Sequence, residues 1–91
     1  MDNLDDVKNN WILSEKENAF VRFANGTPVA IISKNNDDFY TAKYSVYTKE
    51  HGVKRMSENF DIPLEGILWI DTYLLSIGLA PATWPPISKI I

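Results

Sequence analysis

The chain has 91 residues, of which 45% are hydrophobic and 23% charged, and its net charge at pH 7 is −3. These values are close to the globular average, so they exclude a disordered chain, and the length predicts one domain over residues 1–91. Twelve acidic and nine basic residues argue against a protein that coats nucleic acid, because such proteins carry a basic surface.

The cysteine count and the N-terminal composition bear on the compartment. The chain contains no cysteine, which excludes disulfides, thiolate metal sites and cysteine nucleophiles. Residues 1–10 are polar and acidic, unlike a signal peptide, and no stretch approaches the roughly 18 apolar residues of a membrane span. We therefore expect a cytoplasmic protein that does not enter a membrane, with residues 1–9 flexible.

The first two thirds of the chain have the alternating pattern of β-strands. Five segments are rich in β-branched and aromatic residues: 10–13, 18–24, 29–33, 39–48 and 53–57. Asn25-Gly26 between the second and third segments is the strongest hairpin signal. In the longest segment, Tyr40, Ala42, Tyr44 and Val46 fall on one face, which we expect to be the core face. Residues 10–57 are therefore predicted to form an antiparallel meander of four or five strands.

The apolar period changes to 3.6 from Pro63 onward. Pro63 suits the first turn of a helix and Gly78 suits its end, so one amphipathic helix is predicted over residues 63–77. Its apolar stripe is predicted to consist of Leu64, Ile67, Leu68, Leu74 and Leu75, with Ile70 and Ile77 along the edge. This stripe should cover one face of the sheet, which gives an α+β fold with a single C-terminal helix.

The tail, residues 79–91, is apolar and contains three prolines and Trp84. Two interpretations remain open for it. The tail packs back on the domain and docks Trp84 in a groove, or it is a docking segment for a partner, with its prolines holding it extended.

Residues that could carry catalysis are few. His51 falls in a predicted turn beside Glu50, and Asp37-Asp38 lie in a polar loop whose spacing does not match a calcium loop. The sequence contains no phosphate loop, nucleophile elbow or zinc motif. We therefore expect a non-enzymatic protein that uses no cofactor and no metal.

Asp71 is an exception in the predicted helix because it falls inside the apolar stripe. Burying a lone carboxylate costs several kcal/mol unless the group is paired. One interpretation pairs Asp71 with Arg55, Lys54 or a tyrosine hydroxyl of the sheet, or places it beside an end of the sheet. The other places Asp71 in a pocket or an interface.

Two aromatic residues, Trp69 and Tyr73, lie one turn apart on the predicted outer side of the helix. Exposed tryptophan and tyrosine are enriched where proteins meet, so we predict partner binding by Trp69, Tyr73 and Trp84. The competing interpretation is that the apolar tail covers this side.

The outer face of the sheet is a candidate surface for nucleic acid. Its predicted members are Arg22, Phe39, Lys43, Tyr47 and Lys54. Basic side chains between aromatic rings on an open sheet are the chemistry with which sheet proteins bind phosphates and stack bases.

The predicted function is that of a small protein-binding module: an inhibitor, adaptor or accessory protein. Abundant lysine, isoleucine and asparagine fit an AT-rich bacterial or phage genome, and we expect a protein encoded by a phage or mobile element. The expected partner is another protein or a second copy of the chain, and nucleic-acid binding through the outer sheet face is the alternative.

Overall fold

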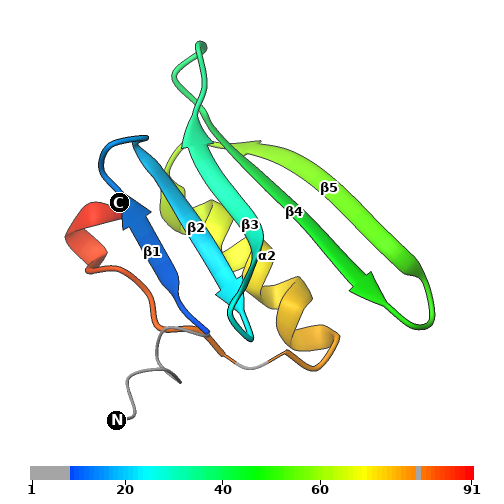
Figure 1. The fold of residues 1–91 in the computed structure, drawn as a ribbon. Coiled ribbons are helices and arrows are strands. Elements are labelled where there is room, and N and C mark those ends of the chain that lie inside the picture. The colour runs from blue at the N-terminus through cyan, green and yellow to red at the C-terminus, as the bar shows by residue number, and fades with distance from the viewer. Residues whose placement is uncertain (1–8, 80) are drawn as a thin grey trace, which may run out of the picture.

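In the part of the chain that the structure describes, five antiparallel strands form one sheet, and one α-helix lies across one of its faces (Figure 1). The computed structural model describes residues 9–79 and 81–91, so the predicted flexible segment lies outside the described residues except for Asn9. The elements are β1 Trp11–Ser14, β2 Ala19–Ala24, β3 Thr27–Lys34, β4 Tyr40–Thr48, β5 Gly52–Phe60, α2 Pro63–Ser76 and the 3-10 turn η1 Ile87–Lys89. The strands are ordered in space as in sequence, which confirms the predicted α+β fold and meander.

The connections between strands use residues that tolerate a left-handed backbone. Asn25 and Gly26, between β2 and β3, have φ angles of 52° and 82°. Two successive positive φ angles are what a two-residue hairpin turn requires, and the predicted turn is confirmed. Gly52, where β5 begins, has a φ of 68°, again in the region that favours glycine.

Strand β4 shows how the alternating pattern determines the two faces of the sheet. Ala42, Tyr44 and Val46 are buried beneath α2, whereas Lys43 and Ser45 between them are exposed, as predicted. Strand β5 is longer than the predicted segment 53–57. It pairs with β4 along its whole length, but most of its side chains are polar and exposed, and Glu58 and Asn59 interrupt the apolar pattern before Phe60.

The helix is rotated about its axis relative to the prediction. Its buried residues are Pro63, Gly66, Ile67, Ile70, Asp71 and Leu74. Leu68 and Leu75, which were assigned to the buried stripe, are 47% and 49% exposed. The reason is Gly66: a Cβ atom there would lie 3.0 Å from Ile32 Cδ1 and 3.2 Å from Ala42 Cβ. The sheet therefore approaches the helix on its glycine side, which a projection of large apolar residues does not show.

The C-terminal tail runs along β1 and reaches the beginning of α2. The Trp11 N–H donates to the Thr83 carbonyl at 2.8 Å, in a parallel bridge at the edge of the sheet. Ile90 is fully buried, and its carbonyl accepts a hydrogen bond from the Leu64 N–H at 2.8 Å. This bond satisfies one of the N–H groups that the first turn of a helix leaves without a partner.

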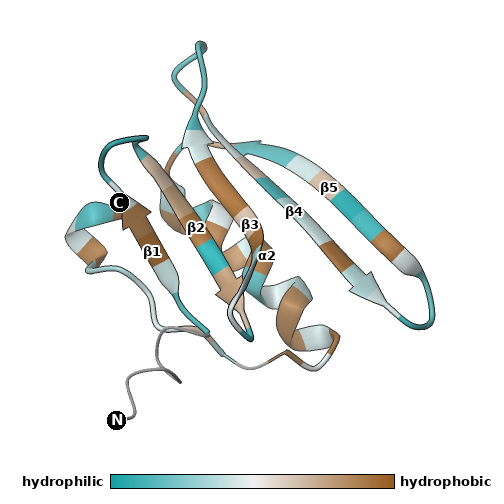
Figure 2. Ribbon diagram, in the orientation of Figure 1, coloured by the Kyte–Doolittle hydropathy of each residue, from teal (hydrophilic) through white to brown (hydrophobic). Residues whose placement is uncertain are grey.

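Hydropathy is unevenly distributed over the sheet. Strands β1, β2 and β3 carry most of the apolar residues, whereas β5 is largely hydrophilic (Figure 2). Within residues 9–79 and 81–91, no helix has the length and apolar character needed to cross a membrane.

Candidate functional site

A buried carboxylate, Asp71, holds four parts of the chain together. Its Oδ1 atom accepts from Arg22 Nε at 3.1 Å, and its Oδ2 atom accepts from Trp11 Nε1 at 3.1 Å and from Trp84 Nε1 at 2.8 Å. These donors come from β2, β1 and the tail, respectively. Hydrogen bonds to an ionised acceptor are roughly twice as strong as neutral ones, so this cluster links the helix to both ends of the domain.

The predicted partners of Asp71 were wrong. The sheet does supply a cation, but it is Arg22 and not Arg55 or Lys54. Arg22 was also wrongly placed on the outer face of the sheet: its side chain is fully buried on the helix side, where it also donates to the Phe23 carbonyl. The alternating pattern of β2 contains the signal, because Arg22 shares a face with the buried Phe20.

Trp69 and Tyr73 lie between the helix and the last two strands, not on the solvent side of the helix. The Tyr73 ring stacks on the Tyr44 ring with centroids 4.7 Å apart, and the Trp69 ring lies 5.2 Å from Tyr44 and 5.6 Å from Phe60. Lys54 Nζ lies 4.8 Å from the Tyr73 centroid. Both predicted binding residues are therefore half-buried against the sheet, because the rotation of α2 turns them toward β4 and β5.

Trp84, the third predicted binding residue, lies in the tail. Its indole N–H points at Asp71, whereas 38% of the residue surface remains exposed. The ring thus anchors the tail by its polar edge and leaves part of its apolar surface accessible.

The outer face, defined as the face of the sheet opposite α2, carries a continuous apolar row. Ile12 pairs with Val21 across β1 and β2, and Val21 pairs with Ile31 across β2 and β3. On β4 and β5 the next positions across the sheet are polar, Lys43 and Ser57, so the apolar row ends at β3. Ile12 is 40% and Ile31 36% exposed, and helix α2 lies behind the sheet when this face is viewed (Figure 1). The part of the chain that the structure describes leaves this row uncovered.

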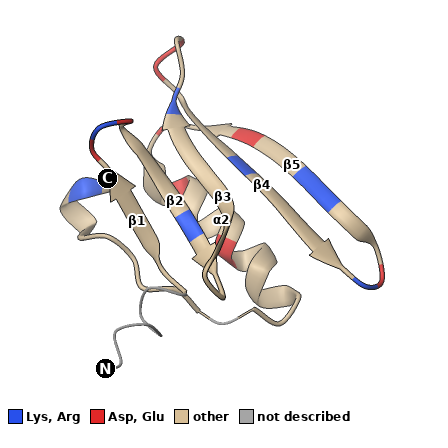
Figure 3. Ribbon diagram, in the orientation of Figure 1, with Lys and Arg blue, Asp and Glu red and all other residues tan. Residues whose placement is uncertain are grey.

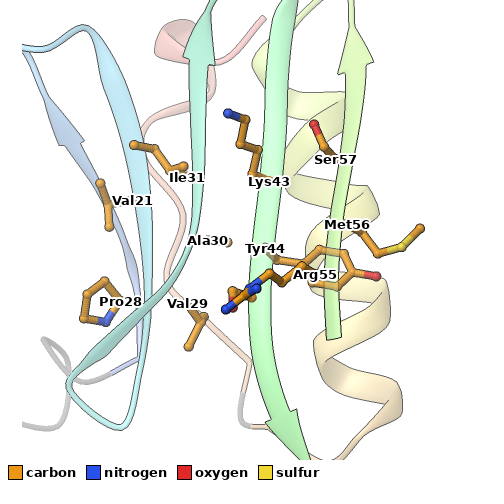
Figure 4. Close-up of a pocket in the computed structure, with 11 residues that line it drawn as sticks. Val21, Pro28, Val29, Ala30, Ile31, Lys43, Tyr44, Arg55, Met56 and Ser57 are labelled. Atoms are coloured by element: carbon orange, nitrogen blue, oxygen red, sulfur yellow. The ribbon is translucent and has the colours of Figure 1, made fainter. Parts of the chain in front are cut away.

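The outer face is hollowed into an open groove of about 550 Å³ (Figure 4). Its lining includes Val21, Val29, Ile31, Lys43, Arg55 and Ser57. The alternation of β1 to β5 assigns two charged strand residues to this face, Lys43 and Arg55, and both are cations. A chain of net charge −3 therefore presents an apolar groove with a positive edge.

The other residues predicted to bind nucleic acid do not all lie on one surface of the structure. Tyr47 is 68% exposed on the outer face, and Phe39 is exposed just before β4 begins. Lys54 was wrongly assigned: its neighbour across β4 and β5 is the buried Val46, so it lies on the helix side. Lys43 and Tyr47 are thus the predicted strand residues that share the outer face.

The acidic and histidine side chains of the loops lie apart from these surfaces. His51 Nε2 lies 3.8 Å from Glu50 at an exposed turn, and Asp38 lies 3.8 Å from Lys34. Within the ranges 9–79 and 81–91, no three His, Cys, Asp or Glu side chains converge.

No known protein family, no curated protein and no solved structure matches this chain. Its function is therefore inferred from the surfaces of the molecule.

Proposed function

We propose that this chain is a non-enzymatic protein-binding module, an inhibitor, adaptor or accessory protein, that holds a segment of another protein on the outer face of its sheet. The observation that carries the proposal is the row of exposed Ile12, half-buried Val21 and exposed Ile31. Contiguous exposed apolar surface is uncommon on soluble domains and marks contact sites. Val21 and Ile31 of this row line the groove of about 550 Å³, which offers space for side chains of a bound segment.

The charges around the groove define the chemistry of the partner. Lys43 and Arg55 lie on its β4 and β5 side, and the apolar row lies on its β1 to β3 side. A complementary segment has apolar side chains that cover Val21 and Ile31, followed by aspartate or glutamate near the two cations. Such complementarity contributes to specificity and to the rate of association.

Nucleic-acid binding is the weaker alternative because the outer face of the strands supplies two cations. Neutralising two phosphates of a single strand gives a salt dependence of only about −1.4 in log K against log salt concentration. Stacking on Tyr47 would have to supply most of the affinity. An apolar row on β1 to β3 has no role in such a complex.

The test is selection of peptides from a displayed random library on the immobilised chain. Peptides that combine apolar and acidic residues should be recovered, and NMR shift mapping should place them on β2, β3 and β4. Ile31→Asp should weaken their binding at least about tenfold, which corresponds to about 1.4 kcal/mol. The matched control is Leu75→Asp on α2, at a residue that is 49% exposed, and it should leave binding unchanged.

Two results would contradict the proposal. One is that selected peptides shift residues of α2 or the tail and bind the Ile31→Asp variant normally. The other is that an oligothymidylate, titrated as a probe, binds the outer face with a slope of about −1.4 in log K against log salt concentration while no peptide binds, which would favour the nucleic-acid alternative.

A further inference from the structure

The last strand of the sheet, β5, has an open edge. It pairs with β4 continuously over nine residues, and its other side meets no strand in the described parts of the chain. At the opposite edge, β1 has four residues and is partly covered by the tail through the bridge from Asn10 to Thr83. Open edges are usually protected by short strands, charged side chains, proline, bulges or a covering segment. Strand β5 contains no proline and no register shift, and its charged residues, Lys54, Arg55 and Glu58, are of both signs, so they can face opposite charges on a second copy.

We propose that β5 pairs antiparallel with β5 of a second copy, around a two-fold axis at Met56, so that the two sheets become one. In an antiparallel pair, directly opposite residues project from the same face. A two-fold axis perpendicular to the sheet must therefore place one residue opposite its own copy. The register is then fixed by the choice of that residue.

The charges of β5 select Met56 as this residue. Pairing around Met56 places Lys54 of each copy opposite Glu58 of the other, so the symmetry produces two Lys–Glu contacts. Pairing around Ser57 instead places Lys54 opposite Phe60, and pairing around Arg55 places Lys54 opposite Met56. Opposite charges facing each other across strands stabilise a sheet, so the register around Met56 is favoured.

Lys54 and Glu58 have no ionic partner among the described residues of their own copy, 9–79 and 81–91, and both are exposed. Basic and acidic residues both lie along β5 (Figure 3). Four residues along a strand separate Lys54 and Glu58 by about 13 Å, too far for direct contact. Met56 lies between them and is 44% exposed although it is apolar. In the proposed dimer, Met56 of the second copy would cover it.

The paired arrangement extends beyond the two strands. The axis places both helices on the same side of the joined sheet, leaving the outer face of each copy open. A hollow of about 570 Å³ lined by Tyr44, Leu68, Trp69 and Tyr73 lies on the helix side, and Tyr73 borders Lys54 of β5. The second copy would thus approach the half-buried aromatic rings, whereas the groove of the outer face remains free. The inference is independent of the proposed function.

The absence of cysteine from the sequence makes a direct test available. In the proposed register, the two copies of residue 56 have Cα atoms about 4.5 or 5.5 Å apart, within the range of disulfides. Met56→Cys should therefore form a disulfide-linked dimer in a glutathione redox buffer. The matched control is Val53→Cys on the same exposed strand. Its copies would lie about 20 Å apart and should not become linked.

Charge reversal tests the register without a cross-link. Lys54→Glu should weaken dimerisation at least about tenfold in sedimentation equilibrium, and Lys54→Glu combined with Glu58→Lys should restore it. Both positions are exposed, so far-UV circular dichroism should show that every variant is folded. The inference is overturned if the natural chain stays monomeric at about 1 mM, a concentration at which even weak association is detected. It is also overturned if the double variant dimerises no more tightly than Lys54→Glu alone. The third contradicting result is that Val53→Cys forms a disulfide-linked dimer as readily as Met56→Cys.

Discussion

Replacing Asp71 by alanine should remove much of the stability of the fold. The substitution removes the carboxylate that pairs with the fully buried Arg22, and breaking one side of a buried ion pair costs about 3 to 5 kcal/mol. The Trp11 indole N–H, on a residue that is 4% exposed, also loses its acceptor, at about 1 to 3 kcal/mol. Trp84 is more exposed, so water can replace its bond. The expected loss in the free energy of unfolding is therefore about 4 to 8 kcal/mol. A chain of this length has a total free energy of unfolding of about 5 to 14 kcal/mol.

The measurement is urea unfolding followed by far-UV circular dichroism, which does not depend on the tryptophans of the cluster. Asp71→Asn is the companion variant, because it keeps one acceptor oxygen without the charge, and we expect a smaller loss than with alanine. The matched control is Asp37→Ala in the exposed loop before β4, which should change the free energy of unfolding by less than about 0.5 kcal/mol.

A loss below about 1 kcal/mol for Asp71→Ala would refute this reasoning. It would mean that Arg22 finds water or another acceptor at little cost, so the cluster would not hold the tail and the helix together. Equal losses for alanine and asparagine would show instead that the negative charge, and not the number of acceptors, carries the effect.

Two further predictions concern the tail and the aromatic cluster. Ile90→Ala should lower the free energy of unfolding in urea by about 2 to 5 kcal/mol, because Ile90 is fully buried. Its neighbour Ile91 is 68% exposed and should tolerate alanine. Equal losses for the two variants would contradict the packing of the tail. Burial raises the pKa of the Tyr44 hydroxyl above 10.0, and Tyr73 raises it further. The folded chain then keeps a proton that the unfolded chain releases, so this contribution to stability is complete below pH 10 and is lost as the pH rises through the raised pKa. Tyr44→Phe should reduce the alkaline loss measured by unfolding at a series of pH values, whereas the exposed control Tyr47→Phe should not.

The strands and the bounds of the helix were predictable because local physics determines them. Alternation in β4 separated its two faces, and Asn25-Gly26 supplied the positive φ angles of the first long hairpin. Pro63 and Gly78 marked the helix, which ends at Ser76 within one residue of the prediction. Each of these signals is contained in a few neighbouring residues.

The rotation of the helix and the partner of Asp71 were not predictable in the same way. The rotation depends on how closely the sheet approaches Gly66, which is a property of two elements together. Arg22 and Asp71 are 49 residues apart, and the sheet contains several other cations that the sequence alone does not exclude. A buried arginine in an alternating apolar strand and a carboxylate in an apolar helix stripe are nevertheless complementary signals. Reading the two together would have favoured the pair.

The apolar row on the outer face is not explained by packing within the described chain. Helix α2 packs on β3, β4 and β5, and the tail, anchored by Trp84 and Ile90, lies along β1. Helix α2 and the tail thus pack on one side of the sheet, and neither covers the outer face. Isoleucine and valine also favour strands for reasons of shape alone, because their branched side chains fit a pleated surface. The row of Ile12, Val21 and Ile31 therefore has two competing explanations, strand propensity and partner binding.

Ile31→Thr separates these explanations, because threonine keeps the branched shape and removes apolar surface. If the row serves only the strand, the variant should match the natural chain both in stability and in binding of the selected peptides. If the row is a contact surface, stability should change by less than about 1 kcal/mol, whereas peptide affinity should fall several-fold. A variant that loses stability and keeps its affinity would show that Ile31 acts within the fold, and the binding surface would then have to lie elsewhere.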